Sequence, residues 1–196
     1  SASNMRDMFA RFHKHFPLRS KPILKKVTPK TWKFPEKDID YLIDTADELD
    51  TGRSFTIHRL HLSEVAFWRD PETLTTGLLR SVDKNPNTMI VAESTANGMG
   101  GWWYDFVTKE NDYTLLFFPW FEDFGNQTPF VDDFQRLEFE RSLDAEEKGL
   151  IDKHWLSHEQ LHWRREEIKN GFSGNDDNFR QEYPSNLEES FRCLIQ

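Results

Sequence analysis

The stretch FTIHRLHLSEVAFW, residues 55–68, decides the fold prediction. Its first part is rich in β-forming residues and reaches Leu62. It then places a serine and a glutamate, Ser63 and Glu64, before it turns apolar again at Val65. This pattern predicts a β-strand over 55–62 that ends at Ser63-Glu64. In open α/β sheets, ligands bind outside the carboxyl ends of the strands, so Glu64 lies where such a fold places its chemistry.

The residues that follow predict an alternation of strands and helices. We expect a helix over 71–82, a strand over TMIVA (88–92), a loop over ESTANGMGG (93–101), a helix over 102–109 and a strand over YTLLFF (113–118). The order strand, helix, strand, helix, strand predicts an α/β fold with a buried parallel sheet flanked by helices.

The two ends of the chain predict different structure. Residues 1–16 have helical spacing of apolar side chains, and Pro17 ends that helix. Residues 17–35 are rich in proline and lysine and predict a loop with a short strand near Ile23-Leu24. Helix propensity and strand context compete over 38–50, and we favour a strand. Further helices are expected over 144–154, 157–170, 176–183 and 187–194.

Composition is typical of a folded protein. The 196 residues suit one domain, or one domain with a small appendage. The 17 Phe and 7 Trp argue against disorder, although 30% of residues are charged. The single cysteine, Cys193, excludes an internal disulfide and a zinc site with several thiolates. No apolar run approaches the roughly 20 residues of a membrane span, and we expect a protein of the cytoplasm without membrane contact.

Charge is distributed unevenly along the chain. Residues 1–33 contain nine Lys or Arg and one acid, Asp7, a net charge of +8. The whole chain carries −9, which leaves −17 for the rest. A basic arm on an acidic body is able to contact nucleic acid or an acidic partner. A solvated surface is the commoner explanation of such an asymmetry.

The residues at the two strand ends suit phosphoryl chemistry. A carboxylate on a rigid strand end, such as Glu64, orients a water molecule for in-line attack on a phosphoryl group. Hydroxyls and backbone N–H groups in the loop STANG, residues 94–98, suit phosphate binding. Each feature alone is weak, because a glutamate at a strand end is usually only the first solvated residue.

Three other constellations compete with this interpretation. His58, His61 and Glu64 resemble a metal site in spacing, but residues three apart in a strand point to opposite faces. Glu64 and Glu93 would suit glycoside hydrolysis if their carboxylates lay roughly 5–10 Å apart. Trp102-Trp103-Tyr104 are able to stack on bases, yet aromatic side chains on a helix more often pack against the protein.

Five segments in order resemble the large terminase subunit of tailed bacteriophages, the motor ATPase that packages DNA into the procapsid. They are GRSFTIHRLHLSEVAFW (52–68), TMIVAESTANGMGGWWYDF (88–106), LLFFPWFED (115–123), EQLHWRREEI (159–168) and FRQEYPSNLEESF (179–191). The resemblance runs from about residue 51 to 191, and ESTANG with the Gly-Gly-aromatic segment after it is its most specific part. It implies a fold similar to the P-loop NTPases.

The resemblance assigns roles to single residues. Glu64 matches the catalytic glutamate that activates water, at the end of the family's Walker B strand. Ser63 falls where many members have the magnesium-linked aspartate, so a hydroxyl would replace that ligand. The segment ESTANG matches the coupling motif, which would make Ser94, Thr95, Asn97 and Gly98 sense the γ-phosphate. Arg53 would lie at the nucleotide or at a subunit interface.

The resemblance is incomplete. No GxxxxGK[ST] motif, the phosphate-cradling loop, occurs in the 196 residues. We therefore expect residues 1–140 to be the later part of an ATPase core, and residues 141–196 to be a helical segment leading toward a nuclease domain. ATP and Mg²⁺ would be ligands of the full-length protein, and we expect neither to bind this chain tightly.

The implied partners are double-stranded DNA, the portal and the small terminase subunit, with an oligomeric ring only in the full assembly in the bacterial cytoplasm. An alternative is a non-catalytic remnant or interaction module that retains the fold without nucleotide binding. A helicase-like ATPase unrelated to packaging is a third reading, which would require helicase motifs downstream.

Overall fold

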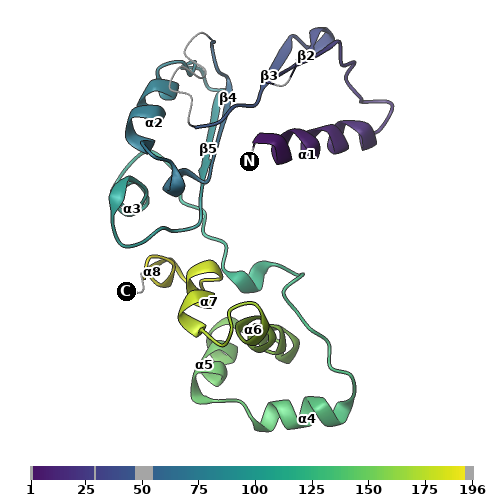
Figure 1. Cartoon of the computed structure of the whole chain (residues 1–196), viewed down its shortest axis with the longest axis vertical. Coiled ribbons are helices and arrows are strands. Elements are labelled where there is room, and N and C mark those ends of the chain that lie inside the picture. The colour runs from purple at the N-terminus through teal and green to yellow at the C-terminus, as the bar shows by residue number, and fades with distance from the viewer. Residues whose placement is uncertain (1, 29, 47–54, 193–196) are drawn as a thin grey trace. The chain divides into compact units, whose positions relative to one another are not determined.

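The computed structural model describes residues 2–28, 30–46 and 55–192 (Figure 1). It has a mixed α/β architecture, and its contacts divide the chain into two compact units. The first unit comprises Ser1–Ser63 and Trp68–Ala92, and the second comprises Glu64–Phe67 and Glu93–Gln196.

The first unit opens with helix α1 (Ala2–His15), as the sequence predicted. The strands β1 (Lys26–Val27), β2 (Thr31–Phe34) and β3 (Ile39–Leu42) follow and pair antiparallel in the order β1-β2-β3. The 3₁₀ turn η1 (Pro35–Lys37) and Asp38, in the left-handed conformation with φ 51°, connect β2 to β3. The strand expected within 38–50 is confirmed over Ile39–Leu42, whereas 47–50 lie outside the described residues.

Helix α1 covers one face of this small sheet. The Phe9 ring stacks on Tyr41 at 4.3 Å between ring centroids and meets Trp32 edge-on at 4.9 Å. Trp32 and Phe34 are buried, whereas their neighbours in β2 are only half-buried. The prediction of a loop over 17–35 with a strand at Ile23-Leu24 was wrong, because this alternation over TWKF forms a strand one step before Pro35.

The first unit also contains a parallel pair of strands. Strand β4 (Arg59–Ser63) is followed by helix α2 (Pro71–Leu79), and β5 (Met89–Glu93) pairs with β4 in the same direction. The Asp70 side chain caps α2 by accepting a hydrogen bond of 3.1 Å from the Thr73 N–H. The two strands and the helix between them therefore confirm this part of the prediction.

The predicted three-stranded buried sheet is wrong in two respects. Residues 113–118 form no strand, and Leu116 and Phe118 are 70% and 73% exposed. Strand β5 is not buried, since Met89 and Val91 are also exposed. An apolar run becomes a strand only when it pairs with a neighbour, and hydrophobicity alone does not reveal whether an edge is present.

The second unit contains the 3₁₀ turn η2 (Val65–Phe67) and is otherwise helical after β5. Its elements are α3 (Gly101–Thr108), the 3₁₀ turn η3 (Trp120–Glu122), α4 (Asp133–Arg141), α5 (Ala145–His154), α6 (His158–Asn170), α7 (Asp176–Glu182) and α8 (Leu187–Ser190). The predicted helices are confirmed with bounds shifted by a few residues; of the helix predicted over 187–194, residues 193–194 lie outside the described residues. Helix α4 was missed.

One apolar core holds helices α4 to α7 together. Its buried members are Trp120, Phe139, Leu156, Leu161 and Phe179. The Trp120 ring stacks on Trp163 at 5.5 Å, and its indole N–H donates to the Ser185 hydroxyl at 3.2 Å.

The helix pair α5 and α6 is joined by ion pairs as well as by this core. Glu147 of α5 is 2% exposed and accepts two hydrogen bonds from Arg165 of α6, at 2.6 and 2.5 Å. Arg164 is also buried and bridges Glu146 and Asp176, at 3.0 and 2.7 Å.

Candidate functional site

Glu64 occupies an unusual backbone position directly after β4. Its φ is +57°, in the left-handed region that costs a residue with a side chain on the order of 1 kcal/mol. The Phe67 N–H donates to the Glu64 carbonyl at 3.0 Å, which closes a tight turn. Val65 inside this turn is fully buried, whereas the Glu64 side chain is exposed. The turn is thus anchored by Val65 and presents the carboxylate to solvent.

The loop after β5 is hydrogen-bonded to this turn through the backbone of Ala66. The Ser94 hydroxyl accepts a hydrogen bond of 3.1 Å from the Ala66 N–H. The Asn97 side-chain amide donates to the Ala66 carbonyl at 3.2 Å. The structure therefore brings together the Glu64 turn and the Ser94–Asn97 loop, two segments about thirty positions apart in the sequence.

The remaining residues of the loop have different surroundings. Thr95 is exposed, and its hydroxyl has no hydrogen-bond partner among the residues that the structure describes. Ala96 is buried. Gly98 is buried too and has φ +87°, a conformation that favours glycine. The loop thus holds Ser94, Ala96 and Gly98 against the protein and leaves the Thr95 side chain exposed.

Two predicted residues lie at the margin of this arrangement. Ser63 is the last residue of β4, and its carbonyl accepts a hydrogen bond of 3.0 Å from the Trp68 indole N–H. Its hydroxyl has no partner within the described ranges, so it is not committed to the fold. Arg53 lies outside the described residues.

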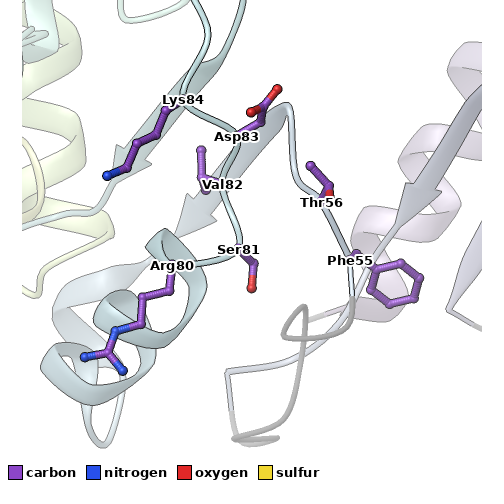
Figure 2. Close-up of a pocket in the computed structure, with 7 residues that line it drawn as sticks. All are labelled: Phe55, Thr56, Arg80, Ser81, Val82, Asp83 and Lys84. Carbon is purple, nitrogen blue, oxygen red and sulfur yellow. The ribbon is translucent and has the colours of Figure 1, made fainter.

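A shallow cavity of about 580 Å³ lies elsewhere (Figure 2). It is lined by Phe55, Thr56, Arg80, Ser81, Val82, Asp83 and Lys84. Thr56 precedes β4 and Lys84 precedes β5, so the cavity is near the starts of the strands, whereas Glu64 follows the end of β4. Figure 2 shows the Arg80 and Lys84 side chains extending away from Phe55, so neither positive charge points toward that ring.

The structure offers little to the competing metal site. Within residues 2–28, 30–46 and 55–192, no group of three or more His, Cys, Asp or Glu is placed to hold a metal ion. His58 instead lies 3.6 Å from the Asp83 carboxylate, measured from Nε2 to Oδ2. A magnesium ion has different needs, since it takes one or two protein oxygens and completes its shell with water and phosphate. The Ser63 hydroxyl, which has no partner within the described ranges, fits that donor chemistry.

The aromatic cluster on α3 packs within the protein. Trp102 stacks on Phe106 at 4.8 Å, and Tyr104 meets Phe191 edge-on at 5.1 Å. Trp102, Trp103 and Tyr104 are all half-buried. These contacts support the packing role that the sequence favoured over base stacking.

Ala66 is the member of the site that sequence reasoning missed. It contributes only backbone N–H and C=O groups, and an alanine side chain carries no chemical signal. Its part was visible only indirectly, as the residue two positions after a glutamate at a strand end.

Comparisons with protein-family models, with curated proteins and with solved structures found no match to this chain. None of the helices within the described residues has the length and apolar character needed to cross a bilayer.

Proposed function

We propose that this chain is part of the large terminase subunit of a tailed bacteriophage or prophage, and that its site belongs to the ATPase that drives DNA packaging. Residues 1–140 would be the later part of the ATPase core, with a fold similar to the P-loop NTPases. Residues 141–196 would be the helical segment that leads toward a nuclease domain.

One observation carries this proposal. The glutamate that matches the family's catalytic residue and the loop that matches its coupling motif are joined through Ala66, by hydrogen bonds of 3.1 and 3.2 Å. A hydrolase that couples turnover to movement needs its water-activating group to be in contact with a segment able to report the state of the phosphate. The resemblance over ESTANG and the contact with the Glu64 turn are independent of each other.

Glu64 would act on the attacking water. Its carboxylate is exposed at the end of β4, on a turn that Val65 anchors. A carboxylate held in this way accepts a hydrogen bond from water and fixes the direction of its lone pair toward a γ-phosphate. The protein's contribution in phosphoryl transfer is mainly such positioning, together with electrostatic stabilisation.

Ser63 is the residue that would contribute to Mg²⁺ binding, with waters and phosphate oxygens filling the rest of the coordination. When bound, the ion neutralises developing charge on the phosphate oxygens. Ser63 would contribute a hydroxyl where many relatives in the resembled family contribute a carboxylate, so we expect weak magnesium affinity.

The partners would be those of the packaging machine. They are double-stranded DNA, the portal and the small terminase subunit, in an oligomeric ring within the bacterial cytoplasm. The segment of net charge +8 over residues 1–33 is compatible with contact to DNA phosphates.

Phosphate release by the protein translated from the full reading frame, with and without double-stranded DNA, tests the proposal. We expect magnesium-dependent turnover that Glu64→Gln lowers by about 10²-fold or more, the size typical of a lost general base. Nucleotide affinity should stay within about threefold, because the amide keeps the side chain's shape. Glu93→Gln, at the end of β5, is the matched control and should lose much less. A Glu64→Gln variant that loses binding but keeps its turnover would contradict the assigned role.

A second function is a non-catalytic interaction module that keeps the fold. Ser63 in place of the magnesium-linked aspartate, and the lack of a GxxxxGK[ST] motif in the 196 residues, favour it. Absence of nucleotide binding and of turnover in the full reading-frame product, with binding to portal or small terminase subunit retained, would establish this alternative. The 196 residues alone are expected to show no ATPase above background.

A further inference from the structure

We propose that Ser94 and Asn97 are positioning residues for Glu64, acting through the Ala66 backbone, and that Thr95 is the member of the loop that contacts the nucleotide. This inference rests on the proposed ATPase function and deepens it. It differs from the prediction that Ser94, Thr95 and Asn97 all sense the γ-phosphate alike.

The first step is that Ala66 is hydrogen-bonded through both its N–H and its C=O. Ser94 accepts a hydrogen bond from the Ala66 N–H, and Asn97 donates to the Ala66 carbonyl. A residue held at its N–H and its C=O has little freedom to rotate its two flanking peptide planes. We define Ser94, Asn97 and Ala66 together as the Ala66 clasp.

The second step is the strained backbone conformation of Glu64, which the clasp would hold in place. Glu64 has φ +57°, a conformation that L residues other than glycine adopt rarely. The Phe67 N–H to Glu64 carbonyl bond, at 3.0 Å, makes Ala66 part of the same turn. Releasing Ala66 would therefore let the Glu64 backbone relax out of the left-handed region, and the carboxylate would move with it.

The third step is the difference between the loop's polar side chains. Ser94 and Asn97 already have partners in the protein. Thr95 lies between them, is exposed, and has a hydroxyl without a partner among the described residues. A hydroxyl on a loop is a common ligand of phosphate oxygens. Contact of Thr95 with phosphate would displace the neighbouring Ser94 and Asn97. Their hydrogen bonds to Ala66 would then shift the Glu64 turn.

Amide hydrogen exchange of the 196-residue chain, resolved by NMR, tests the clasp without any ATPase assay. We expect Ser94→Ala to speed exchange at the Ala66 N–H by about tenfold, the effect of losing one hydrogen bond. Ser94→Thr keeps the hydroxyl and should retain most of the protection. Asn97→Asp is nearly isosteric but cannot donate to the Ala66 carbonyl. Because that carbonyl and the Phe67 N–H belong to one peptide group, this variant should speed exchange at Phe67.

Two comparisons make this result decisive. Thr95→Ala should leave exchange at Ala66 and Phe67 within about twofold, because its hydroxyl is outside the clasp. Amides of α6 report whether a variant is folded, and they should be unchanged in all four variants. If Ser94→Ala unfolds the chain, Asn97→Asp alone decides. Unchanged exchange at Ala66 and Phe67 in the folded variants would overturn the clasp.

Kinetics of the full reading-frame protein test the division of roles. Ser94→Ala and Asn97→Asp should lower kcat by about tenfold with KM for ATP within about threefold, whereas Thr95→Ala should mainly raise KM. Changes confined to KM in Ser94→Ala and Asn97→Asp would overturn the positioning role. An inactive wild-type protein would refute the ATPase function, whereas the exchange experiment would still decide whether the clasp exists.

Discussion

At the scale of single residues, the site depends on one exposed carboxylate on a constrained turn. Glu64 has a positive φ and follows β4 directly, and Val65 next to it is fully buried. The sequence predicted the place of Glu64 at a strand end and the nearness of ESTANG to it. It did not predict the left-handed backbone or the part of Ala66, because neither depends on side-chain chemistry.

The serine before Glu64 allows a test of the magnesium ligand. In the full reading-frame protein, we expect Ser63→Asp to lower the Mg²⁺ concentration needed for half-maximal ATP turnover by about tenfold, because a carboxylate binds Mg²⁺ better than a hydroxyl. Ser63→Ala should raise that concentration. Turnover measured across a magnesium titration gives the answer, and a Ser63→Asp variant that needs as much Mg²⁺ as wild type would exclude this residue from the metal site.

A histidine in the helical unit gives a prediction on pH. Burial lowers the pKa of His154 below 6.5, and the positive charge of Lys153 lowers it further; its ring lies 4.6 Å from Phe121. Between the folded pKa and 6.5, the unfolded chain binds more protons than the folded chain. The free energy of unfolding should therefore fall as pH drops through this window. Above the window, titration of His154 should add no pH dependence to it.

Urea denaturation at pH 7.5 and pH 5.5 checks this effect. We expect His154→Gln to lose less stability between the two pH values than wild type does, since glutamine does not titrate. An NMR titration of the His154 ring that gives a pKa at or above 6.5 would contradict the prediction.

At the scale of elements, the helices were the part most readily predicted. Helices α5 and α6 each begin with a capping box, Asp144 with Glu147 and Ser157 with Gln160, in which side chains satisfy the first free N–H groups. Such signals are local in the sequence. The antiparallel sheet pairs segments that are close in sequence, such as Phe34 with Ile39, yet strand propensity alone misplaced its strands. The same propensity predicted a strand over 113–118, which form none.

The α5–α6 contact yields a stability prediction. Glu147 is buried, caps α5 and receives two hydrogen bonds from Arg165, and that bonding raises the pKa of the arginine. We expect Glu147→Ala to lower the free energy of unfolding by about 2 kcal/mol, because it removes a buried carboxylate that both pairs with the partly exposed Arg165 and caps α5. The matched control is Glu138→Ala, whose exposed pair with Arg141 at 3.4 Å should contribute less than about 0.5 kcal/mol.

Chemical denaturation followed by far-UV circular dichroism measures both variants. Equal losses of stability in Glu147→Ala and Glu138→Ala would show that burial of the first pair has no energetic consequence.

At the scale of the whole molecule, the chain is a mixed α/β protein whose contacts form two units, and the Glu64 turn belongs to the same unit as the loop that holds it. The α/β class was predictable from the order of strands and helices. The extent of the parallel sheet was not, because only β4 and β5 pair in parallel among the described strands. Arg53 and the rest of 47–54 lie outside the described residues, so its role stays a prediction.

The central claim is that the Glu64 turn and the Ser94–Asn97 loop border one nucleotide site. A structure of the full reading-frame protein with Mg²⁺ and a non-hydrolysable ATP analogue tests it most directly. We predict a water molecule about 3 Å from the Glu64 carboxylate, in line with the γ-phosphate, and the Thr95 hydroxyl on a phosphate oxygen. A nucleotide bound elsewhere, with Glu64 and Thr95 both facing bulk solvent, would contradict the account.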